Sequence, residues 1–473
     1  MKNLFTFIFI VFSFSTFAQT PVSGNQSGVW AVSGSPFQVT GDVTVPTGES
    51  LSIEPGVVVD FQGHYKLTVN GSLQANGTES DSVFFTTDDP ATGWHGIRLT
   101  ESQNGSVFTF CHIEYGKTSG SNFPDQHGGG IMMNNSNAVI ENCLFLNNDA
   151  SANDNGMGGA IYGFNTSSET LIAECVFKNN NSYGEGGAIK LTGDIGANIL
   201  NCSFIDNTVL YGGGAICLYG CYDTHILRCL FTGNVTSYSS GGAVFIEGYS
   251  ARIVFVNCTI YDNHATGGDG GAVEIAFSDA SFTNSIIYNN PGAYSDNIFL
   301  DLGYAEINYC DTPLPDGAEG ENNINTNPQF VDAPSGDFHL SETSPCIDAG
   351  IDSLTITTAF SEIITVVDMD SADYIGIAPD MGCFEYDPST GMVSRLTENF
   401  TIYPNPTSGH IYFELPDVDV RGISITDLTG KVLFSSTEIP MNNSIDISEF
   451  DSGIYVVTIQ ISDIRLTSKV IKE

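Results

Sequence analysis

Short runs in which every second residue is hydrophobic recur along most of the chain, and glycine, proline or asparagine separates them. Near the N-terminus these runs include Gly28–Trp30, Phe37–Val45, Leu51–Val59 and Leu67–Gly71. A period of two predicts strands with one buried face. The 3.6-residue period of an amphipathic helix is absent. The pattern therefore predicts an all-β protein.

Two motifs repeat with the same period and alternate along the chain. The first is Cys or Ser, an apolar residue two positions later and Asn five positions later. It begins at Cys143, Cys175, Cys202, Cys229, Cys258 and Ser285, with a weaker copy at Cys111. The steps between the six first members are 32, 27, 27, 29 and 27 residues. The second motif is Gly-Gly-Ala-Ile/Val, at residues 158–161, 186–189, 213–216, 241–244 and 270–273, with a variant at 128–131.

This spacing predicts a solenoid of parallel strands, a parallel β-helix. Equivalent residues of successive coils then stack about 4.8 Å apart. The Cys and apolar positions lie two residues apart, so they share one face, and we expect it to face inward. The Asn column falls where the strand ends, and its amides can bond the turn and one another. Gly-Gly-Ala predicts a bend too tight for large side chains.

The opening strands, together with Trp94-His-Gly-Ile97, resemble the first coils of bacterial secreted right-handed β-helix proteins. The two repeated motifs resemble those of polymorphic outer-membrane proteins. This resemblance covers roughly residues 28–310 and implies a right-handed parallel β-helix, which we assign to residues 19–310. It is specific for fold and only weakly informative about activity.

The first 18 residues predict a secretory signal peptide. Lys2 supplies a positive start, Leu4–Phe14 is a short apolar run, and Thr16–Ala18 resembles a cleavage site. The apolar run is too short to span a bilayer, and no later run is long enough. We therefore expect a protein that is secreted or held at the cell surface without a transmembrane helix.

The C-terminal third divides into three predicted parts. Residues 311–386 resemble the region that closes many bacterial β-helix surface proteins, called the choice-of-anchor region. Residues 387–398 form a linker rich in turn-forming residues. Residues 399–473 contain alternating strands separated by turn signals, which predict a small β-sandwich of about seven strands.

This last part resembles the sorting domain of type IX secretion, a family found in Bacteroidetes. The resemblance rests on Tyr403–Gly409, Asp427–Lys431, Gly453–Tyr455 and Lys469–Lys472, which occur in the family's order. It implies that residues 399–473 engage the type IX secretion machinery. It also implies that the domain is removed as the cargo is released or fixed to the outer surface.

The chain has 11 cysteines. We expect those of the first motif to be buried, unreactive thiols. Because the exported environment is oxidising, we predict a disulfide between Cys346 and Cys383. Cys217 and Cys221 flank Leu-Tyr-Gly and offer a second, smaller loop closure. No Cys-x-x-Cys pair occurs, which disfavours a zinc site.

The charge is strongly unbalanced. There are 14 Lys and Arg residues against 55 Asp and Glu, a net charge of −41, which excludes nucleic acid as a partner. From Ile253 to Ser394 there is no Lys or Arg and there are 23 acidic residues. An acidic glycan would be repelled there unless calcium bridges the charges, so calcium is the one cofactor left open. Asp368, Asp370 and Asp373 lack EF-hand spacing, and a solvated loop is the preferred interpretation.

The outward positions of the Gly-Gly-Ala strands predict a carbohydrate-binding surface, because aromatic faces stack on sugar rings and polar groups bond hydroxyls. Its residues are Tyr162, Phe164, Lys190, Tyr219, Phe245, Glu247 and Glu274. Ordinary stacking of exposed side chains is the competing interpretation.

A polysaccharide-degrading enzyme remains the alternative to a binding or adhesive surface. Glu247 and Glu274 lie on adjacent coils, two positions out of register, which places their Cα atoms about 8 Å apart. That separation is compatible with an acid and base pair of a glycoside hydrolase. A polysaccharide lyase would need a basic residue, and Lys190 is the one available at these positions.

Overall fold

The computed structural model of the 473-residue chain divides into two compact units, residues 1–385 and 386–473. It describes residues 19–102, 105–120, 122–151, 154–357, 363–388, 401–414, 420–427, 431–436, 444–451, 453–461 and 464–472. The predicted signal peptide, residues 1–18, and most of the predicted linker lie outside the described residues.

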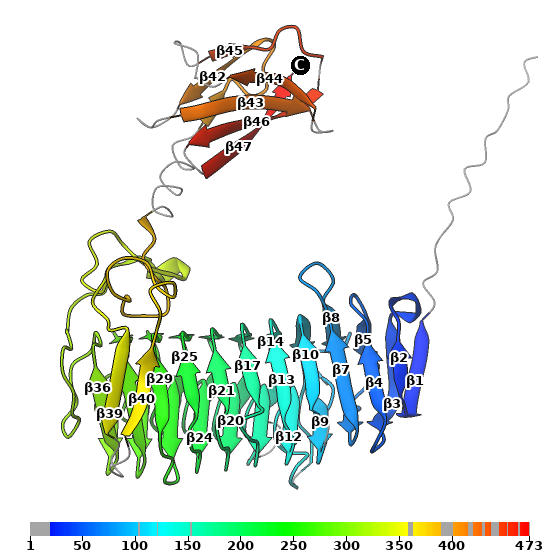
Figure 1. Cartoon of the computed structure of the whole chain (residues 1–473). Coiled ribbons are helices and arrows are strands. Elements are labelled where there is room, and N and C mark those ends of the chain that lie inside the picture. The colour runs from blue at the N-terminus through cyan, green and yellow to red at the C-terminus, as the bar shows by residue number, and fades with distance from the viewer. Residues whose placement is uncertain are drawn as a thin grey trace, which may run out of the picture. The chain divides into compact units, whose positions relative to one another are not determined.

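The first unit is a right-handed parallel β-helix in which each coil adds a strand to each of three long parallel sheets (Figure 1). Sheet 1 holds the Gly-Gly-Ala strands. Its members are β6 (Leu67–Val69), β9 (Ile97–Thr100), β12 (Ile131–Asn134), β16 (Ile161–Phe164), β20 (Ile189–Thr192), β24 (Ile216–Tyr219), β28 (Val244–Glu247), β32 (Val273–Ala276) and β35 (Ile298–Asp301).

Sheet 2 follows sheet 1 along each coil. Its members are β2 (Gly28–Trp30), β4 (Ser50–Ile53), β7 (Ser72–Asn76), β10 (Ser106–Thr109), β13 (Ala138–Glu141), β17 (Leu171–Ala173), β21 (Asn198–Leu200), β25 (His225–Leu227), β29 (Ile253–Val256), β33 (Asp279–Thr283) and β36 (Tyr304–Asn308). A 3-10 turn, η1 (Val32–Gly34), follows β2.

Sheet 3 carries the Cys-x-Phe motif. Its members are β1 (Thr20–Asn25), β3 (Phe37–Val45), β5 (Val58–Phe61), β8 (Val83–Thr86), β11 (Cys111–Glu114), β14 (Leu144–Leu146), β18 (Val176–Lys178), β22 (Ser203–Ile205), β26 (Leu230–Thr232), β30 (Thr259–Tyr261) and β34 (Ile286–Tyr288). The long strand β3 also pairs with β6 and so joins sheets 1 and 3. A short ladder after sheet 3 consists of β15 (Asp149–Ala150), β19 (Asn181–Ser182), β23 (Thr208–Val209), β27 (Val235–Thr236) and β31 (His264–Ala265).

The inward stacking of the first motif is confirmed. The rings of Phe145, Phe177, Phe204 and Phe231 are fully buried and stack with centroids 4.8, 4.9 and 4.8 Å apart. The cysteines at positions 111, 143, 175, 202, 229 and 258 are buried in the same core. Burial raises the pKa of the Cys202 thiol well above its ordinary value, so this thiol stays protonated.

The tight bend predicted for Gly-Gly-Ala is also present. Gly186 has a φ of +66°, and a Cβ on Gly187 would lie 2.1 Å from the carbonyl oxygen of Gly214 on the next coil. No larger residue fits at Gly187, because the backbone of the neighbouring coil occupies that space.

The closing region covers the last coils. Parallel bridges from Glu306 to Glu319 and from Asp311 to Ile324 extend the coil pairing past β36. After them come β37 (Phe330–Asp332), η2 (Ala333–Ser335) and β38 (Asp337–Leu340), followed by the antiparallel pair β39 (Ser353–Thr357) and β40 (Ile363–Asp368). Val367 of β40 packs on Val254 and Val256 of β29, so this pair lies on the outer face of sheet 2.

The structure differs from the predicted disulfide between Cys346 and Cys383. Both residues are free thiols in it. The Cys346 Sγ is directed to Asp311 Oδ2 at 3.5 Å, whereas the backbone N–H of Cys383 donates to Thr259 Oγ1 at 3.0 Å. Separate contacts therefore hold the two residues. Cys217 and Cys221 are free as well, since Cys221 belongs to the core and Cys217 does not.

The second unit is a small β-sandwich of two antiparallel sheets. One contains β41 (Thr401–Tyr403), β42 (His410–Glu414) and β45 (Ser444–Asp446), and the other contains β43 (Val420–Asp427), β44 (Val432–Ser436), β46 (Gly453–Ile461) and β47 (Ile464–Lys472). Ile411, Ile425 and Val457 are among its fully buried core residues. In the described part of the chain, no helix is long and apolar enough to cross a membrane.

Candidate functional site on the outer face of sheet 1

The side chains of sheet 1 alternate between the core and the outer face. In β20, Ile189 and Leu191 belong to the core, so Lys190 and Thr192 project to the other side. Parallel register then aligns the outward residues into two columns. The first column is Arg98, Met132, Tyr162, Lys190, Cys217, Phe245 and Glu274, and the second is Thr100, Asn134, Phe164, Thr192, Tyr219 and Glu247.

The first column is largely covered, although the sequence pattern predicts that it is exposed. Tyr162 is 5% exposed, Lys190 2% and Glu274 8%. The reason is that the segments preceding the Gly-Gly turns fold back over this column. The ring of His127 stacks on Tyr162 with centroids 4.4 Å apart. Gly212 packs directly on the ring of Phe245, since a Cβ added to this glycine would lie 2.1 Å from Phe245 Cδ1.

The second column is more open. Tyr219 is 48% exposed, whereas Phe164 and Glu247 are half-buried. The edge of the Phe123 ring packs on Phe164, with centroids 5.3 Å apart. Among the seven predicted binding residues, Tyr219 is therefore the one exposed aromatic, with about half of its surface accessible.

Four side chains meet on this face and form what we call the Lys190 cluster: Glu185, Lys190, Cys217 and Glu247. The Lys190 Nζ lies 2.5 Å from Glu185 Oε2, 3.1 Å from Cys217 Sγ and 3.4 Å from Glu247 Oε1. Lys190, Cys217 and Glu247 come from the successive strands β20, β24 and β28, and Glu185 precedes the Gly186 turn. The ring centroid of Tyr219 lies 5.2 Å from the same Nζ, within cation–π range.

The electrostatics of the cluster keep Lys190 charged. Burial by itself would lower the pKa of Lys190, but Cys217, Glu185 and Glu247 outweigh it and raise that pKa. Burial and then the charge of Glu185 raise the pKa of Glu247, against the opposing effect of Lys190. Lys190 is thus a fixed ammonium and is not available as a general base.

The ligand atoms of Glu185, Cys217 and Glu247 lie within 4.8 Å of one another, close enough to hold a metal ion. The Lys190 ammonium contacts all three and fills the position that such an ion would take. A thiol is also a poor ligand for calcium, which prefers oxygen. In the structure as described, Asp368, Asp370 and Asp373 form no such group, and all three are exposed.

Glu274 has a different environment from Glu247. It pairs in register with Phe245, so it lies on the coil next to Glu247 with the predicted offset of two residues. Burial raises the pKa of Glu274 to about 7, with a hydrogen bond from Ser240 opposing the shift. At neutral pH this carboxyl group is therefore partly protonated, which is a property of a general acid or base.

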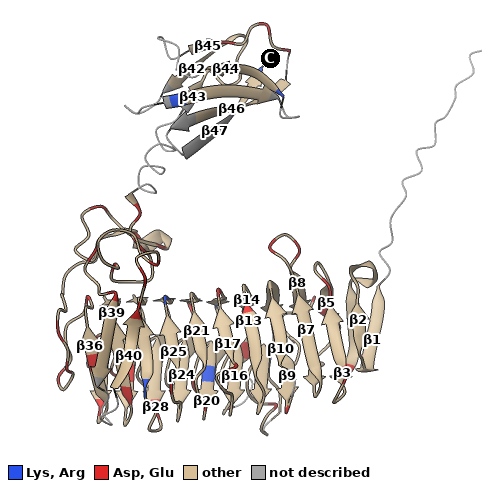
Figure 2. Cartoon of the chain, in the orientation of Figure 1, with Lys and Arg blue, Asp and Glu red and all other residues tan. Residues whose placement is uncertain are grey.

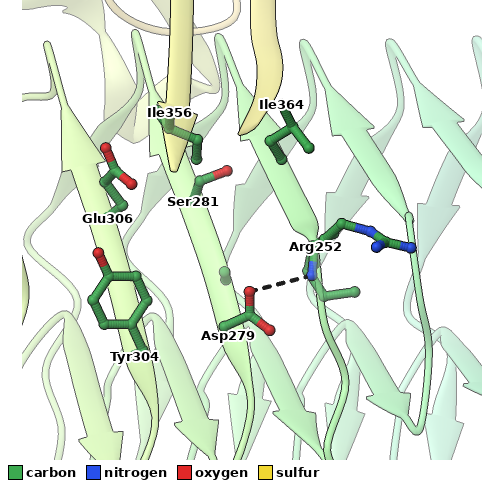
Figure 3. A pocket seen from close by; sticks show the side chains of 9 residues that line it. Arg252, Asp279, Ser281, Tyr304, Glu306, Ile356 and Ile364 are labelled. Carbon is green, nitrogen blue, oxygen red and sulfur yellow. Dashed lines mark hydrogen bonds between the residues drawn. The ribbon is translucent and has the colours of Figure 1, made fainter. Parts of the chain in front are cut away.

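Two pockets border the β39–β40 pair rather than sheet 1. The one in Figure 3 lies between that pair and sheet 2, and its volume of about 10 Å³ admits about one water molecule. The Arg252 backbone N–H donates to Asp279 Oδ2 beside it, at 3.4 Å. A second pocket, of about 260 Å³, has Leu227, Val256 and Met369 in its wall. None of the predicted binding residues lines either pocket.

Three segments of the chain match known families. Residues 401–473 match the secretion system C-terminal sorting domain, and residues 186–312 match the right-handed β-helix region. The chain is a right-handed β-helix protein with a type IX secretion sorting domain. Residues 174–192 of this β-helix protein also match the polymorphic membrane protein repeat of Chlamydia. No curated protein matches the chain.

The β-helix protein has an aromatic ladder that the strand pattern does not reveal. Tyr183, Tyr211 and Tyr238 precede successive Gly-Gly turns, and their ring centroids lie 5.9 and 6.4 Å apart. Tyr211 is 44% exposed and Tyr238 69%. The spacing of 28 and 27 residues, equal to the coil period, is the sequence signal that identifies this ladder. The strand pattern also does not identify Glu185 as a member of the Lys190 cluster, because this residue lies in a turn.

Charge on the β-helix is dominated by carboxylates. Figure 2 shows acidic residues on many loops and very few basic segments, one of them on β20, the strand of Lys190. Because the Lys190 ammonium is already paired with Glu185 and Glu247, it adds little positive potential to the surface.

Proposed function

We propose that this is a secreted or cell-surface protein that presents a carbohydrate-binding or adhesive surface on the outer face of sheet 1. In this proposal a signal peptide, residues 1–18, directs the chain to the periplasm of a Bacteroidetes cell. Residues 399–473 then direct it through the type IX machinery to the outer surface. The sorting domain found at 401–473 supports this route.

The exposed tyrosines beside sheet 1 are the observation that supports a glycan ligand most directly. Tyr211 and Tyr238 repeat at the coil spacing, and Tyr219 presents its ring beside the half-buried carboxylate of Glu247. Aromatic faces stack on sugar rings, and carboxylates accept hydrogen bonds from hydroxyl groups. A row of rings at the coil period suits an extended chain of repeating sugars.

The charge of this region favours a neutral glycan, or one held through calcium. Near sheet 1 the positive charge of Lys190 is neutralised by Glu185 and Glu247. From Ile253 to Ser394 no Lys or Arg is available to attract an acidic polymer. A uronate or sulfated chain lying along these coils would face uncompensated carboxylates.

A glycoside hydrolase is the second candidate, and the titration of Glu274 favours it. Its pKa of about 7 suits a general acid, and Glu247 lies on the adjacent coil. A polysaccharide lyase receives less support, because Lys190 is held as an ammonium ion by two carboxylates and cannot abstract a proton.

A glycan panel read for both binding and cleavage tests the proposal. We expect Tyr219→Ala and Tyr238→Ala each to weaken binding about tenfold, the loss of one aromatic contact of about 1.4 kcal/mol. Tyr412→Ala, which removes a 41% exposed tyrosine of the second unit, serves as the matched control. Unchanged binding in Tyr219→Ala and Tyr238→Ala would show that the outer face of sheet 1 is not the glycan-binding site.

The enzyme alternative has its own readout. Release of reducing ends that Glu274→Gln abolishes would establish a hydrolase, and unsaturated uronate products, assayed with and without calcium, would establish a lyase. Absence of both across a broad panel would leave the binding role.

Deletion of residues 399–473 tests the export route. We expect the truncated protein to accumulate in the periplasm, because the signal that the outer-membrane machinery reads is gone. Delivery of the truncated protein to the surface at the normal level would refute this role.

A further inference from the structure

Arg98 is a buried cation with an incomplete set of partners. It lies on β9 in the first outward column and is 2% exposed. Its Nη1 donates to the carbonyl oxygen of Gly128 at 2.5 Å. Its Nε and Nη2 atoms are buried and have no hydrogen-bond partner among the described residues. A buried guanidinium group with two unmet donors is costly, so these atoms point to a missing acceptor.

The surroundings of Arg98 do not supply that acceptor. Asp125 is the acidic group that acts on it, but this carboxylate is already paired with Lys66 at 2.9 Å. The His95 Nε2 donates to the backbone oxygen of Asp125 at 2.9 Å, and the His64 Nε2 donates to that of Lys117 at 3.0 Å. Asp42 accepts a hydrogen bond from the Lys66 backbone N–H at 3.2 Å, so the charges of Lys66, Arg98, Asp42 and Asp125 balance, yet none of these carboxylates bonds the Nε–Nη2 edge of Arg98 among the described residues.

The nearby imidazoles do not change this balance. Burial, followed by the charge of Arg98, lowers the pKa of His95 and of His127 to about 4, so both rings are neutral at neutral pH. Burial lowers the pKa of Arg98 to about 10, which still leaves it protonated. The Nε–Nη2 edge of Arg98 is therefore a charged donor edge without an acceptor among the described residues.

Arg252 of the same chain shows which kind of acceptor group fits the Nε and Nη2 atoms of Arg98. Its Nε and Nη2 bind the two carboxylate oxygens of Asp223, the second at 2.6 Å. This side-on edge of a guanidinium group matches the spacing of carboxylate oxygens and forms two charge-assisted hydrogen bonds. Arg98 presents the same edge without a carboxylate.

We propose that the Nε–Nη2 edge of Arg98 binds the carboxylate group of a small ligand, either a free carboxylic acid or an acidic sugar. The segment from Asp125 to Gly128, whose carbonyl groups bond His95 and Arg98, covers the guanidinium group. Binding therefore requires this segment to move aside. The site is separate from the Lys190 cluster, whose cation is already neutralised.

Calorimetric titration of the full mature chain tests the proposal at constant ionic strength with acetate, galacturonate and galactose. We expect acetate and galacturonate to bind, and galactose not to bind at this site. Equal affinities for acetate and galacturonate would show that the carboxylate group alone determines binding. Tighter binding of galacturonate would show that the ligand is an acidic sugar. In Arg98→Lys, which keeps the charge but loses the side-on edge, we expect binding at least about tenfold weaker.

Arg252→Lys is the matched control, because it loses the same edge at a site that already holds Asp223. We expect its carboxylate affinity to equal that of the unmodified chain. Failure of both acids to bind, or equal binding by Arg98→Lys, would overturn the proposal. If Arg98→Lys does not fold, a crystal structure of the unmodified chain in acetate decides. A carboxylate on Nε and Nη2 supports the site, and ordered water alone at these atoms overturns it.

Discussion

Asn207 donates from Nδ2 to Oδ1 of Asn234 over 2.9 Å, within a continuous ladder of buried amides. The ladder runs through Asn148, Asn180, Asn207, Asn234, Asn263 and Asn290, with Nδ2 to Oδ1 distances of 2.8 to 3.0 Å. Each amide also bonds backbone groups where the strand of sheet 3 ends, for example Asn207 Nδ2 to Phe177 O at 2.9 Å. The ladder thereby satisfies polar groups that the coil buries at this corner.

Asn207→Ala should destabilise the β-helix by about 2–4 kcal/mol, since it leaves the backbone N–H and the side-chain amide of Asn180 without their acceptor. Chemical denaturation measures the loss. The half-buried neighbour Asn181 bonds Asp149 outside the ladder, and Asn181→Ala should cost less than about 1 kcal/mol. Equal losses in the two variants would show that the ladder has no special role.

Thiol titration separates buried thiols from a disulfide. In the native protein we expect most cysteines to react slowly, because burial raises the pKa of Cys258 and Cys383, the latter to about 12. In denaturant without reductant, all 11 cysteines should react. If only nine cysteines react, the two that do not would mean that a disulfide such as Cys346–Cys383 forms in the exported protein. Rapid native labelling would contradict the inward ladder.

Lys190→Ala should convert the Lys190 cluster into a metal site. Removing the ammonium leaves Glu185, Cys217 and Glu247 facing one another without a cation, at a cost of about 3 kcal/mol. Zn²⁺ accepts thiolate and carboxylate ligands, so it should raise the melting temperature of this variant and not that of the unmodified chain.

The control for this variant is Lys178→Ala, which removes an exposed lysine of β18 and should change stability by less than about 0.5 kcal/mol. If Lys190→Ala were as stable as Lys178→Ala and indifferent to Zn²⁺, the electrostatic coupling within the cluster would be disproved.

Glu274 should make stability fall as the pH rises. Its pKa is raised from 4.5 to about 7 in the folded state, so between these values the folded chain binds more protons than the unfolded chain. The free energy of unfolding of Glu274→Gln, relative to that of the unmodified chain, should therefore rise by up to about 1.4 kcal/mol per pH unit across this window. Denaturation at pH 5 and pH 8 measures the difference. The exposed Asp316→Asn should show no such gain, and a flat Glu274→Gln difference would contradict the burial argument.

The sequence by itself determined the coil, the inward ladders and the sorting domain. Strand faces follow from a period of two, and the recurrence of Cys175 and Asn180 at the coil length places equivalent residues one above another. These signals are local and repeat along the chain, so each copy supports the others. The pattern also identified Lys190, Tyr219 and Glu247 as outward residues.

The tertiary structure decided which outward residues are exposed and which groups they meet. Tyr162 and Glu274 are buried where His127 and Ser240, which precede the Gly-Gly turns of neighbouring coils, contact them. Lys190 meets Glu247, 57 residues away, and the side-on edge of Arg98 is left without a partner among the residues that the structure describes. A period of two gives only the direction of a side chain. Its exposure and its partners depend on contacts between residues distant in sequence, which only the folded chain brings together.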